Sequence, residues 1–332
     1  MQLPRLGMGC SALGNLYSPL SDAESYEAIA AALDGGVRYF DTAPFYGFGL
    51  SERRLGSALR SYPAPDVLIS TKVGRVLVPT TEAGTREGFV DALPYRPVFD
   101  YSHDAVMRSH EASLERLGRS RVNILLAHDL GARTHGSRSE EMTAAFLNGG
   151  YEAMRRLRSL NQIDGIGIGV NETAICEQLL DAVELDVILL AGRYTLLEQG
   201  ALDLLDRCER LGVRVVIGGP FNSGLLVEPD SAQTRHYDYQ SAPPEMIQAA
   251  RALSCVCAQF EVPLPAAALR FPTAHPAVSC VLPGLASAQQ VKQALEWWEW
   301  DIPSRLWVAL HDAGMIPSVQ YGVQNPNREQ EI

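Results

Sequence analysis

Short apolar runs alternate with amphipathic stretches along the whole chain of 332 residues. The apolar runs are continuous rather than alternating with polar residues, which is the pattern of strands that are covered on both faces. The predicted strands are 6–10, 37–41, 67–72, 122–128, 166–170, 187–191, 213–217 and 278–282. An amphipathic stretch follows each of them, which predicts helices at 22–34, 51–61, 103–117, 151–160, 173–183, 200–211, 244–260 with 265–271, and 287–297.

This repeated strand–helix order predicts an α/β fold, a (β/α)8 TIM barrel. A doubly wound sheet is the alternative, but no Gly-x-Gly-x-x-Gly turn joins a strand to a helix. Without a Pro- or Ser-rich linker, residues 1–317 are predicted to form one barrel domain and 318–332 a polar C-terminal tail. Two long stretches, 74–102 and 130–150, follow the third and fourth strands and are expected to wall a site.

Composition narrows the classes of partner. A net charge of −11 argues against nucleic acid and anionic membranes, since both require a concentrated basic face. No apolar run is long enough to span a bilayer and no secretory signal is recognisable, so we expect a cytoplasmic protein. The six cysteines are scattered without the spacing of metal ligands, so no metal site is expected.

Polar residues with chemical potential fall at the ends of consecutive predicted strands. Asp41 ends the second strand, Tyr46 lies in the loop after it, Lys72 ends the third and His128 ends the fourth. Because the carboxyl ends of barrel strands meet at one mouth, where barrel enzymes carry out their chemistry, we expect these side chains to converge. Ser51, just beyond this loop, is the predicted N-cap of the next helix.

The four residues together could tune the pKa of the Tyr46 phenol. A free tyrosine titrates near pH ~10, and a neighbouring lysine ammonium favours the phenolate. Asp41 would keep Lys72 charged and oriented, and His128 would hydrogen-bond the substrate oxygen. Tyr46 could then exchange a proton with a carbonyl or hydroxyl oxygen while a hydride moves, which requires a nicotinamide or a flavin.

These residues resemble the aldo-keto reductase superfamily, whose fold is this barrel and whose Asp, Tyr, Lys and His tetrad matches them. The resemblance covers almost the whole chain, including segments 40–43, 168–171, 194–197, 219–226 and 282–284. Segments 43–56, 99–102, 128–129 and 218–224 most resemble the aldose 1-dehydrogenase branch, which contains L-fucose and D-threo-aldose dehydrogenases and pyridoxal 4-dehydrogenase.

The resemblance implies a nicotinamide cofactor. The matching positions are Gly9, Asn171, Gly219, Pro220, Phe221, Asn222, Gly224, Gly284, Ser287 and Gln290. Gly218 stands where many members have a tyrosine that stacks on the nicotinamide, and Ala191 where they have a carboxamide-binding glutamine, which leaves Phe221 as a candidate stacking ring. NADP-preferring members place a cation after the eighth strand, whereas 285–291 has none before Lys292, so NAD is predicted rather than NADP.

The resemblance also implies oxidation of the hemiacetal carbon of an aldose to a lactone, with hydride passing to nicotinamide C4 and Tyr46 accepting the proton. Pyridoxal, which also closes to a cyclic hemiacetal, is the alternative substrate. Phe45 and Tyr17 are the candidates for stacking on either ring. A general NADPH-dependent aldehyde or ketone reductase and a non-catalytic nicotinamide-binding sensor are the rival interpretations. The particular sugar, the reaction direction and the oligomeric state stay open.

Overall fold

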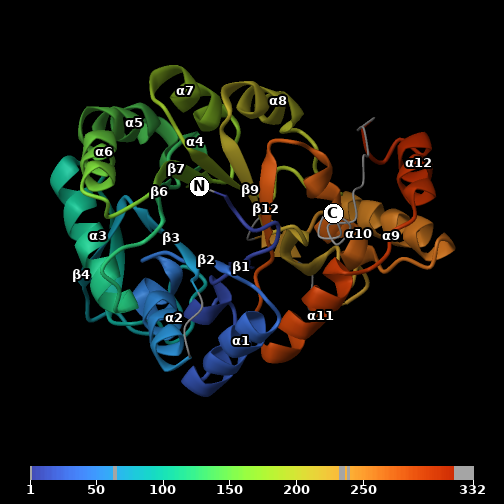
Figure 1. The fold of residues 1–332 in the computed structure, drawn as a ribbon, viewed down its shortest axis with the longest axis horizontal. Coiled ribbons are helices and arrows are strands. Elements are labelled where there is room, and N and C mark those ends of the chain that lie inside the picture. The colour runs from blue at the N-terminus through green and yellow to red at the C-terminus, as the bar shows by residue number, and fades with distance from the viewer. Residues whose placement is uncertain (1, 63–65, 232–235, 238–239, 318–332) are drawn as a thin grey trace.

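The computed structural model describes residues 2–62, 66–231, 236–237 and 240–317 (Figure 1). One parallel sheet runs in the order β1-β2-β3-β6-β7-β8-β9-β12. Its strands are β1 (Met8–Gly9), β2 (Tyr39–Asp41), β3 (Leu68–Val73), β6 (Ile124–His128), β7 (Gly165–Val170), β8 (Val187–Ala191), β9 (Arg214–Gly218) and β12 (Val278–Leu282). Bridges from Leu6 to Val281 and from Gly9 to Gly284 close the sheet, so the predicted barrel is confirmed. The predicted tail, 318–332, lies outside the described residues.

Helices surround the barrel (Figure 1). Those that follow its strands are α1 (Asp22–Asp34), α2 (Leu50–Ser61), α3 (His103–Leu117), α6 (Tyr151–Ser159), α7 (Ala174–Ala182), α8 (Leu202–Leu211), α9 (Pro244–Gln259), α10 (Leu264–Arg270) and α11 (Ala288–Trp298). The first and last of these, α1 and α11, pack side by side, which closes the helical ring. A further helix, α12 (Ser304–Asp312), follows the last predicted one and packs on α9.

The two long stretches have more structure than the sequence predicted. Residues 74–102 contain an antiparallel hairpin of β4 (Arg75–Pro79) and β5 (Tyr95–Phe99). Residues 130–150 are largely helical, with α4 (Ala132–His135), η3 (Gly136–Arg138), α5 (Ser139–Ala145) and the π-helical turn η4 (Phe146–Gly150), which runs directly into α6. The short elements elsewhere are η1 (Ala12–Gly14), η2 (Tyr46–Gly49), η5 (Asn222–Gly224), η6 (Phe271–Ala274), β10 (His236–Tyr237) and β11 (Gln240–Ser241).

The barrel interior is packed by apolar side chains. Its cluster is Leu3, Tyr39, Ile124, Leu126, Val187, Leu189, Val216, Cys280 and Leu282, while a larger cluster fills the space between strands and helices. In the register of β3 and β6, Lys72 lies opposite Leu126. Because side chains at paired positions share a face of the sheet, Lys72 points into the barrel, above this apolar core.

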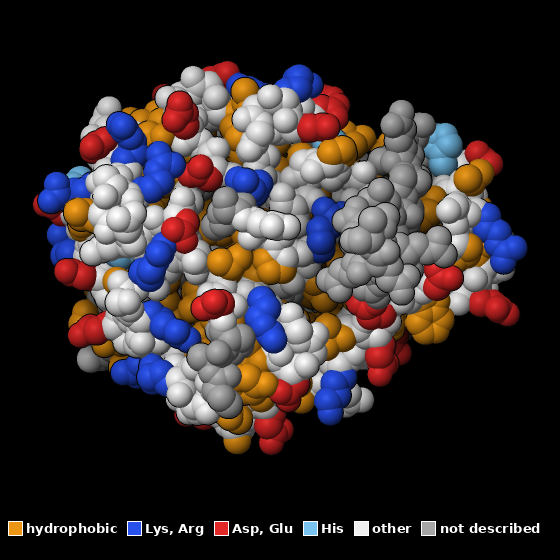
Figure 2. Space-filling model, viewed as in Figure 1, with side chains coloured by type: hydrophobic (Ala, Val, Ile, Leu, Met, Phe, Trp, Pro, Cys, Tyr) orange, Lys and Arg blue, Asp and Glu red, His pale blue; other side chains and the backbone are white. Residues whose placement is uncertain are grey.

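The surface carries interspersed charges of both signs on the face that Figure 2 shows, rather than one concentrated basic region among the described residues. In the part of the chain that the structure describes, no single helix is long and apolar enough to cross a membrane. Only α9 joined to Leu264–Ala274 passes that test as a pair, and the pair is bent by 100°.

Candidate active site

A cavity of about 520 Å³ lies at the carboxyl ends of the barrel strands. The predicted residues Asp41, Tyr46, Lys72 and His128 all line it. So do the predicted substrate residues Phe45 and Tyr17, of which Tyr17 is 48% exposed at the mouth. The site is therefore a deep pocket with the four polar side chains inside and aromatic rings towards its opening.

Lys72 is the centre of the polar group. Its Nζ donates hydrogen bonds to Asp41 Oδ2 at 2.7 Å, to the Thr42 carbonyl at 2.9 Å and to Tyr46 Oη at 3.0 Å. These acceptors satisfy the three N–H bonds of an ammonium group. Burial opposes the charged form, but the Asp41 carboxylate and the Tyr46 oxygen outweigh it and raise the pKa of Lys72. Lys72 is therefore a buried cation that is held against the phenol oxygen.

Tight contacts between two short helical turns position Tyr46. Gly47 has φ 62°, and a Cβ there would lie 2.4 Å from the Gly14 carbonyl oxygen, so only glycine lets η2 lie against η1. The prediction that Ser51 caps α2 is wrong, because the helix begins after Gly49. The Ser51 hydroxyl is buried and donates to the Cys10 carbonyl at 2.7 Å, which ties α2 to the end of β1.

His128 faces the phenol from the fourth barrel strand. Its ring is perpendicular to that of Tyr46, with the centroids 6.0 Å apart. Burial lowers its pKa to about 3, so the imidazole is neutral at physiological pH. Nε2 lies 3.4 Å from Asp129 Oδ2, whereas the buried Nδ1 has no partner among the described residues. We assign the proton to Nε2 from these neighbours. His128 can therefore donate a hydrogen bond to an oxygen in the cavity.

This geometry agrees with the comparison to known proteins. The model of the Aldo/keto reductase family matches residues 5–311. The chain belongs to this family. It is 41% identical over 325 residues to pyridoxal 4-dehydrogenase of Microbacterium luteolum, covering 94% of each chain. It is 35% identical over 324 residues to D-threo-aldose 1-dehydrogenase of Pseudomonas sp., covering 96% of each.

A solved aldo-keto reductase from Bacillus halodurans in its holo form shares the fold, with a TM-score of 0.73 and 22% identity over 97% of this chain and 95% of that one. The resemblance drawn from the sequence is thereby confirmed at the level of the superfamily and its aldose and pyridoxal dehydrogenase branch. The chain is an oxidoreductase of a family that uses nicotinamide cofactors.

The residues predicted to hold the cofactor divide into two groups. Gly9, Asn171, Gly219 and Gly284 line the cavity, as do Gly218 and Ala191 at the two positions that depart from the family pattern. Pro220, Phe221, Asn222, Gly224, Ser287 and Gln290 do not line it. The ring of Phe221 packs edge-on against Trp297, with centroids 5.9 Å apart. The role proposed for Phe221 in stacking therefore has no support from its contacts.

Three observations fit a nicotinamide dinucleotide beside the cavity. In η5, Asn222 Oδ1 is buried without a hydrogen-bond partner among the described residues, so an acceptor awaits a donor. A Cβ on Gly219, which has φ 60°, would meet no atom within 4 Å, so this loop leaves open space. Ser287 Oγ accepts from the N–H of Gln290 at 3.2 Å and caps the N-terminus of α11, which favours a nearby anionic group.

One charged pair in the cavity wall was not predicted as part of the site. Arg75 begins β4 and forms an ion pair with Asp129, the residue after His128. Both line the cavity, with side chains 12% and 16% exposed. Asp129 could have been selected by the same rule that selected His128, because it also follows a strand end. Arg75 could not have been selected by this rule, because it lies in the hairpin within 74–102, a stretch that was predicted to be a loop.

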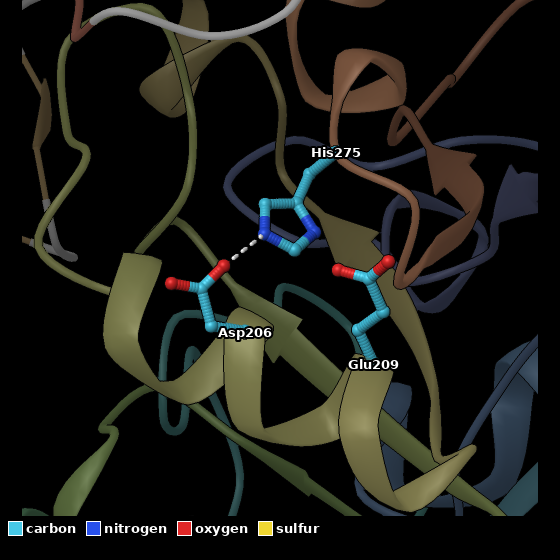
Figure 3. Close-up of side chains that lie close together, drawn as sticks. All are labelled: Asp206, Glu209 and His275. Carbon is cyan, nitrogen blue, oxygen red and sulfur yellow. Dashed lines mark hydrogen bonds and ion pairs between the residues drawn. The ribbon is translucent and has the colours of Figure 1, made fainter.

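A second group of titratable side chains lies away from this cavity. Figure 3 shows Asp206, Glu209 and His275 facing one another, and their ligand atoms lie within 4.8 Å of each other. His275 Nδ1 accepts the N–H of Ala277 at 3.2 Å, which places the ring proton on Nε2, 3.1 Å from Asp206 Oδ1. Because a metal would need the lone pair of Nε2, this arrangement is that of a hydrogen-bonded clamp between α8 and the approach to β12.

The buried His128 predicts a pH dependence of stability. Its pKa is lowered to about 3 in the folded chain, against ~6.5 in the unfolded chain, so below pH ~6.5 the unfolded state binds the extra proton. We expect stability to fall as the pH drops from about 6.5 towards 3, and His128→Gln to show a shallower fall. Urea titrations at pH 7 and pH 4.5 measure the difference. Burial also lowers the pKa of His110 to about 4, but His110 is present in both proteins, so its contribution cancels in the comparison. If the unfolding free energy fell equally with pH in the wild type and in His128→Gln, His128 would not be buried in its neutral form.

Proposed function

We propose that this chain is an NAD-dependent dehydrogenase that oxidises the hemiacetal carbon of an aldose to the lactone. The main support is the contact of Tyr46 Oη with Lys72 Nζ at 3.0 Å, inside a cavity that also holds a neutral His128. A tyrosine whose oxygen touches a buried cation is deprotonated more readily than an isolated phenol, and the phenolate can accept a proton.

In this proposal each side chain has one task. His128 donates its Nε2 proton in a hydrogen bond to the anomeric oxygen and orients the hydroxyl towards Tyr46. Tyr46 reacts as the phenolate that Lys72 stabilises, and its Oη takes the hydroxyl proton as the carbon loses its hydride. Asp41 keeps Lys72 charged and fixed at 2.7 Å. A bound nicotinamide would supply the hydride acceptor at C4. The apolar barrel floor excludes water from below.

Pyridoxal is the second candidate substrate, and the 41% identity to pyridoxal 4-dehydrogenase favours it. Its hemiacetal carbon would present the same hydroxyl to Tyr46, so the tetrad does not separate the two substrates. Phe45 and Phe89 line the cavity in edge-on contact at 5.2 Å and offer an apolar wall to either substrate. Selectivity between a sugar and a pyridine ring must therefore come from the other side chains that line the cavity.

A substrate panel tests the proposed function. The purified protein is incubated with NAD and L-fucose, D-arabinose, other aldoses or pyridoxal, and NADH formation is followed at 340 nm with lactone identified by mass spectrometry. We expect NADH and lactone in equal amounts from at least one aldose. Lactone from pyridoxal alone would replace the aldose by the second candidate. Turnover of aromatic aldehydes with NADPH, without lactone from any hemiacetal, would refute both and leave a general reductase.

Cofactor preference is a separate prediction. The first turn of α11 carries no cation to hold a 2′-phosphate, and Ser287 and Gln290 bond the backbone of their own turn. We expect kcat/KM with NAD to exceed that with NADP by about tenfold or more, the loss expected for an unpaired phosphate. Gln289→Arg, on an exposed position of this turn, should narrow the ratio. Gln293→Arg, one turn further along, is the matched control. A wild-type preference for NADP would contradict the assignment.

A further inference from the structure

The Arg75–Asp129 pair has no evident structural task. It joins the start of β4 to the end of β6 inside the cavity wall, where both charges lose most of their hydration. A largely buried ion pair of this kind is weak evidence for stability, because the desolvation cost offsets the attraction. Asp129 also has φ 53°, a left-handed conformation that is uncommon for residues other than glycine and that aspartate adopts more readily than most.

Both side chains keep hydrogen-bonding capacity that the protein does not use. The bond between them runs from Arg75 Nη2 to Asp129 Oδ2. Among the described residues, no donor reaches Asp129 Oδ1, and Nη2 is the one Arg75 nitrogen that donates a hydrogen bond. A carboxylate accepts at both oxygens and a guanidinium donates five hydrogens, so an acceptor and donors are left over in the cavity wall.

The position of this pair is fixed before any ligand binds. The Arg75 guanidinium stacks on the ring of Phe45 at 3.8 Å and lies 4.8 Å from the ring centre of Phe99. The backbone N–H of Asp129 donates to the Gly169 carbonyl at 2.9 Å, which anchors Asp129 to β7. A preorganised donor–acceptor pair loses little conformational entropy on binding.

The chemistry that fits such a pair is a row of hydroxyl groups. Each hydroxyl both donates and accepts, so adjacent hydroxyls can donate to Asp129 and accept from Arg75 at the same time. The pair lies beside His128, with Asp129 Oδ2 3.4 Å from its Nε2, so bound hydroxyls would be next to the reacting carbon. An anionic ligand fits this subsite poorly, because Arg75 is already paired with the Asp129 carboxylate, which would repel the anion.

We propose that Arg75 and Asp129 form a polyol-binding subsite that recognises the hydroxyls beside the reacting carbon. Arg75 and Asp129 then determine specificity for hydroxyl-rich substrates over simple aldehydes. The proposal deepens the proposed function and rests on it for the identity of the substrate as a sugar.

Asp129→Asn and Arg75→Lys test the subsite, with Asp164→Asn as the control for an exposed carboxylate paired with Arg121. We expect each cavity variant to raise KM for the preferred aldose about 10- to 100-fold, the effect of losing a charged hydrogen bond. The KM for its 2-deoxy analogue should rise less, and the ratio of the aldose KM to the KM for benzaldehyde reduction with NADH should rise at least tenfold. Urea unfolding and NADH affinity, measured beside the wild type, establish that the variants are folded.

Inhibition by a sugar alcohol separates the subsite from the proposed reaction. An alditol should inhibit benzaldehyde reduction by the wild type and by Asp164→Asn, and at least tenfold more weakly in Asp129→Asn. If the wild type forms no lactone but shows this inhibition pattern, the proposed function fails and the subsite stands. If Asp129→Asn instead lowers kcat equally for all substrates and shifts the pH profile, Asp129 acts through His128 and the subsite is refuted. Unchanged KM values for the aldose would refute it as well.

Discussion

Tyr46→Phe should lower kcat by about 10²- to 10⁴-fold, the usual contribution of a positioned proton-transfer group. The substitution removes only Oη, the atom that accepts a hydrogen bond from Lys72 at 3.0 Å. The ring keeps its contacts with Phe89 and His128, so the cavity should keep its shape. NAD affinity, measured by quenching of tryptophan fluorescence, should stay within about twofold because a phenol oxygen is not needed to hold the cofactor. Steady-state rates with the best substrate of the panel measure kcat.

Tyr194→Phe is the matched control. Tyr194 is fully buried outside the cavity, and its Oη has no hydrogen-bond partner among the described residues. Loss of this hydroxyl should leave kcat within about twofold of the wild type, since it touches no reacting group. A Tyr46→Phe protein that keeps more than about a tenth of the wild-type kcat would show that another group, or water, exchanges the proton. Tyr46 would then not be the group that exchanges the proton.

The barrel was predictable because its strands are buried on both faces. A strand such as 166–170 or 187–191 must be apolar throughout, which makes it visible in the sequence. The hairpin of β4 and β5 was missed for the opposite reason. Its strands are only partly buried, and Pro97 interrupts the second one. Proline is tolerated there because β5 pairs only with β4, at the edge of a two-stranded sheet.

The same contrast holds for the site. The positions of Asp41, Lys72 and His128 follow from barrel geometry, since each ends or nearly ends a strand and the strand ends converge. Contacts that depend on loop packing do not follow from it. Arg75 reaches Asp129 because the hairpin begins in the cavity wall, and Phe221 packs on Trp297, which belongs to α11. No local pattern in the sequence encodes either approach.

Breaking the Lys72–Asp41 ion pair should cause the largest loss of stability. Lys72→Met should abolish measurable turnover and also lower the free energy of unfolding by about 3–5 kcal/mol, the cost of a buried charge left without its partner. The Asp41 side chain is only 5% exposed and would keep a single strong donor, Ser70 Oγ at 2.6 Å. Asp41→Asn should destabilise the fold in the same sense, because Lys72, 2% exposed, would lose its counter-charge.

The double variant Lys72→Met/Asp41→Asn separates stability from catalysis. With both charges removed, the free energy of unfolding should return to within about 2 kcal/mol of the wild type, since a neutral pair avoids the desolvation cost of either ion. Turnover should stay absent, because no cation remains at Tyr46 Oη. Urea unfolding and steady-state kinetics on all four proteins complete the cycle. If stability returned together with activity, Lys72 would be a structural residue only. If the loss of unfolding free energy in the double variant equalled the sum of the losses in the two single variants, Lys72 and Asp41 would not be electrostatically coupled. The main contact of Lys72 would then lie elsewhere in the site.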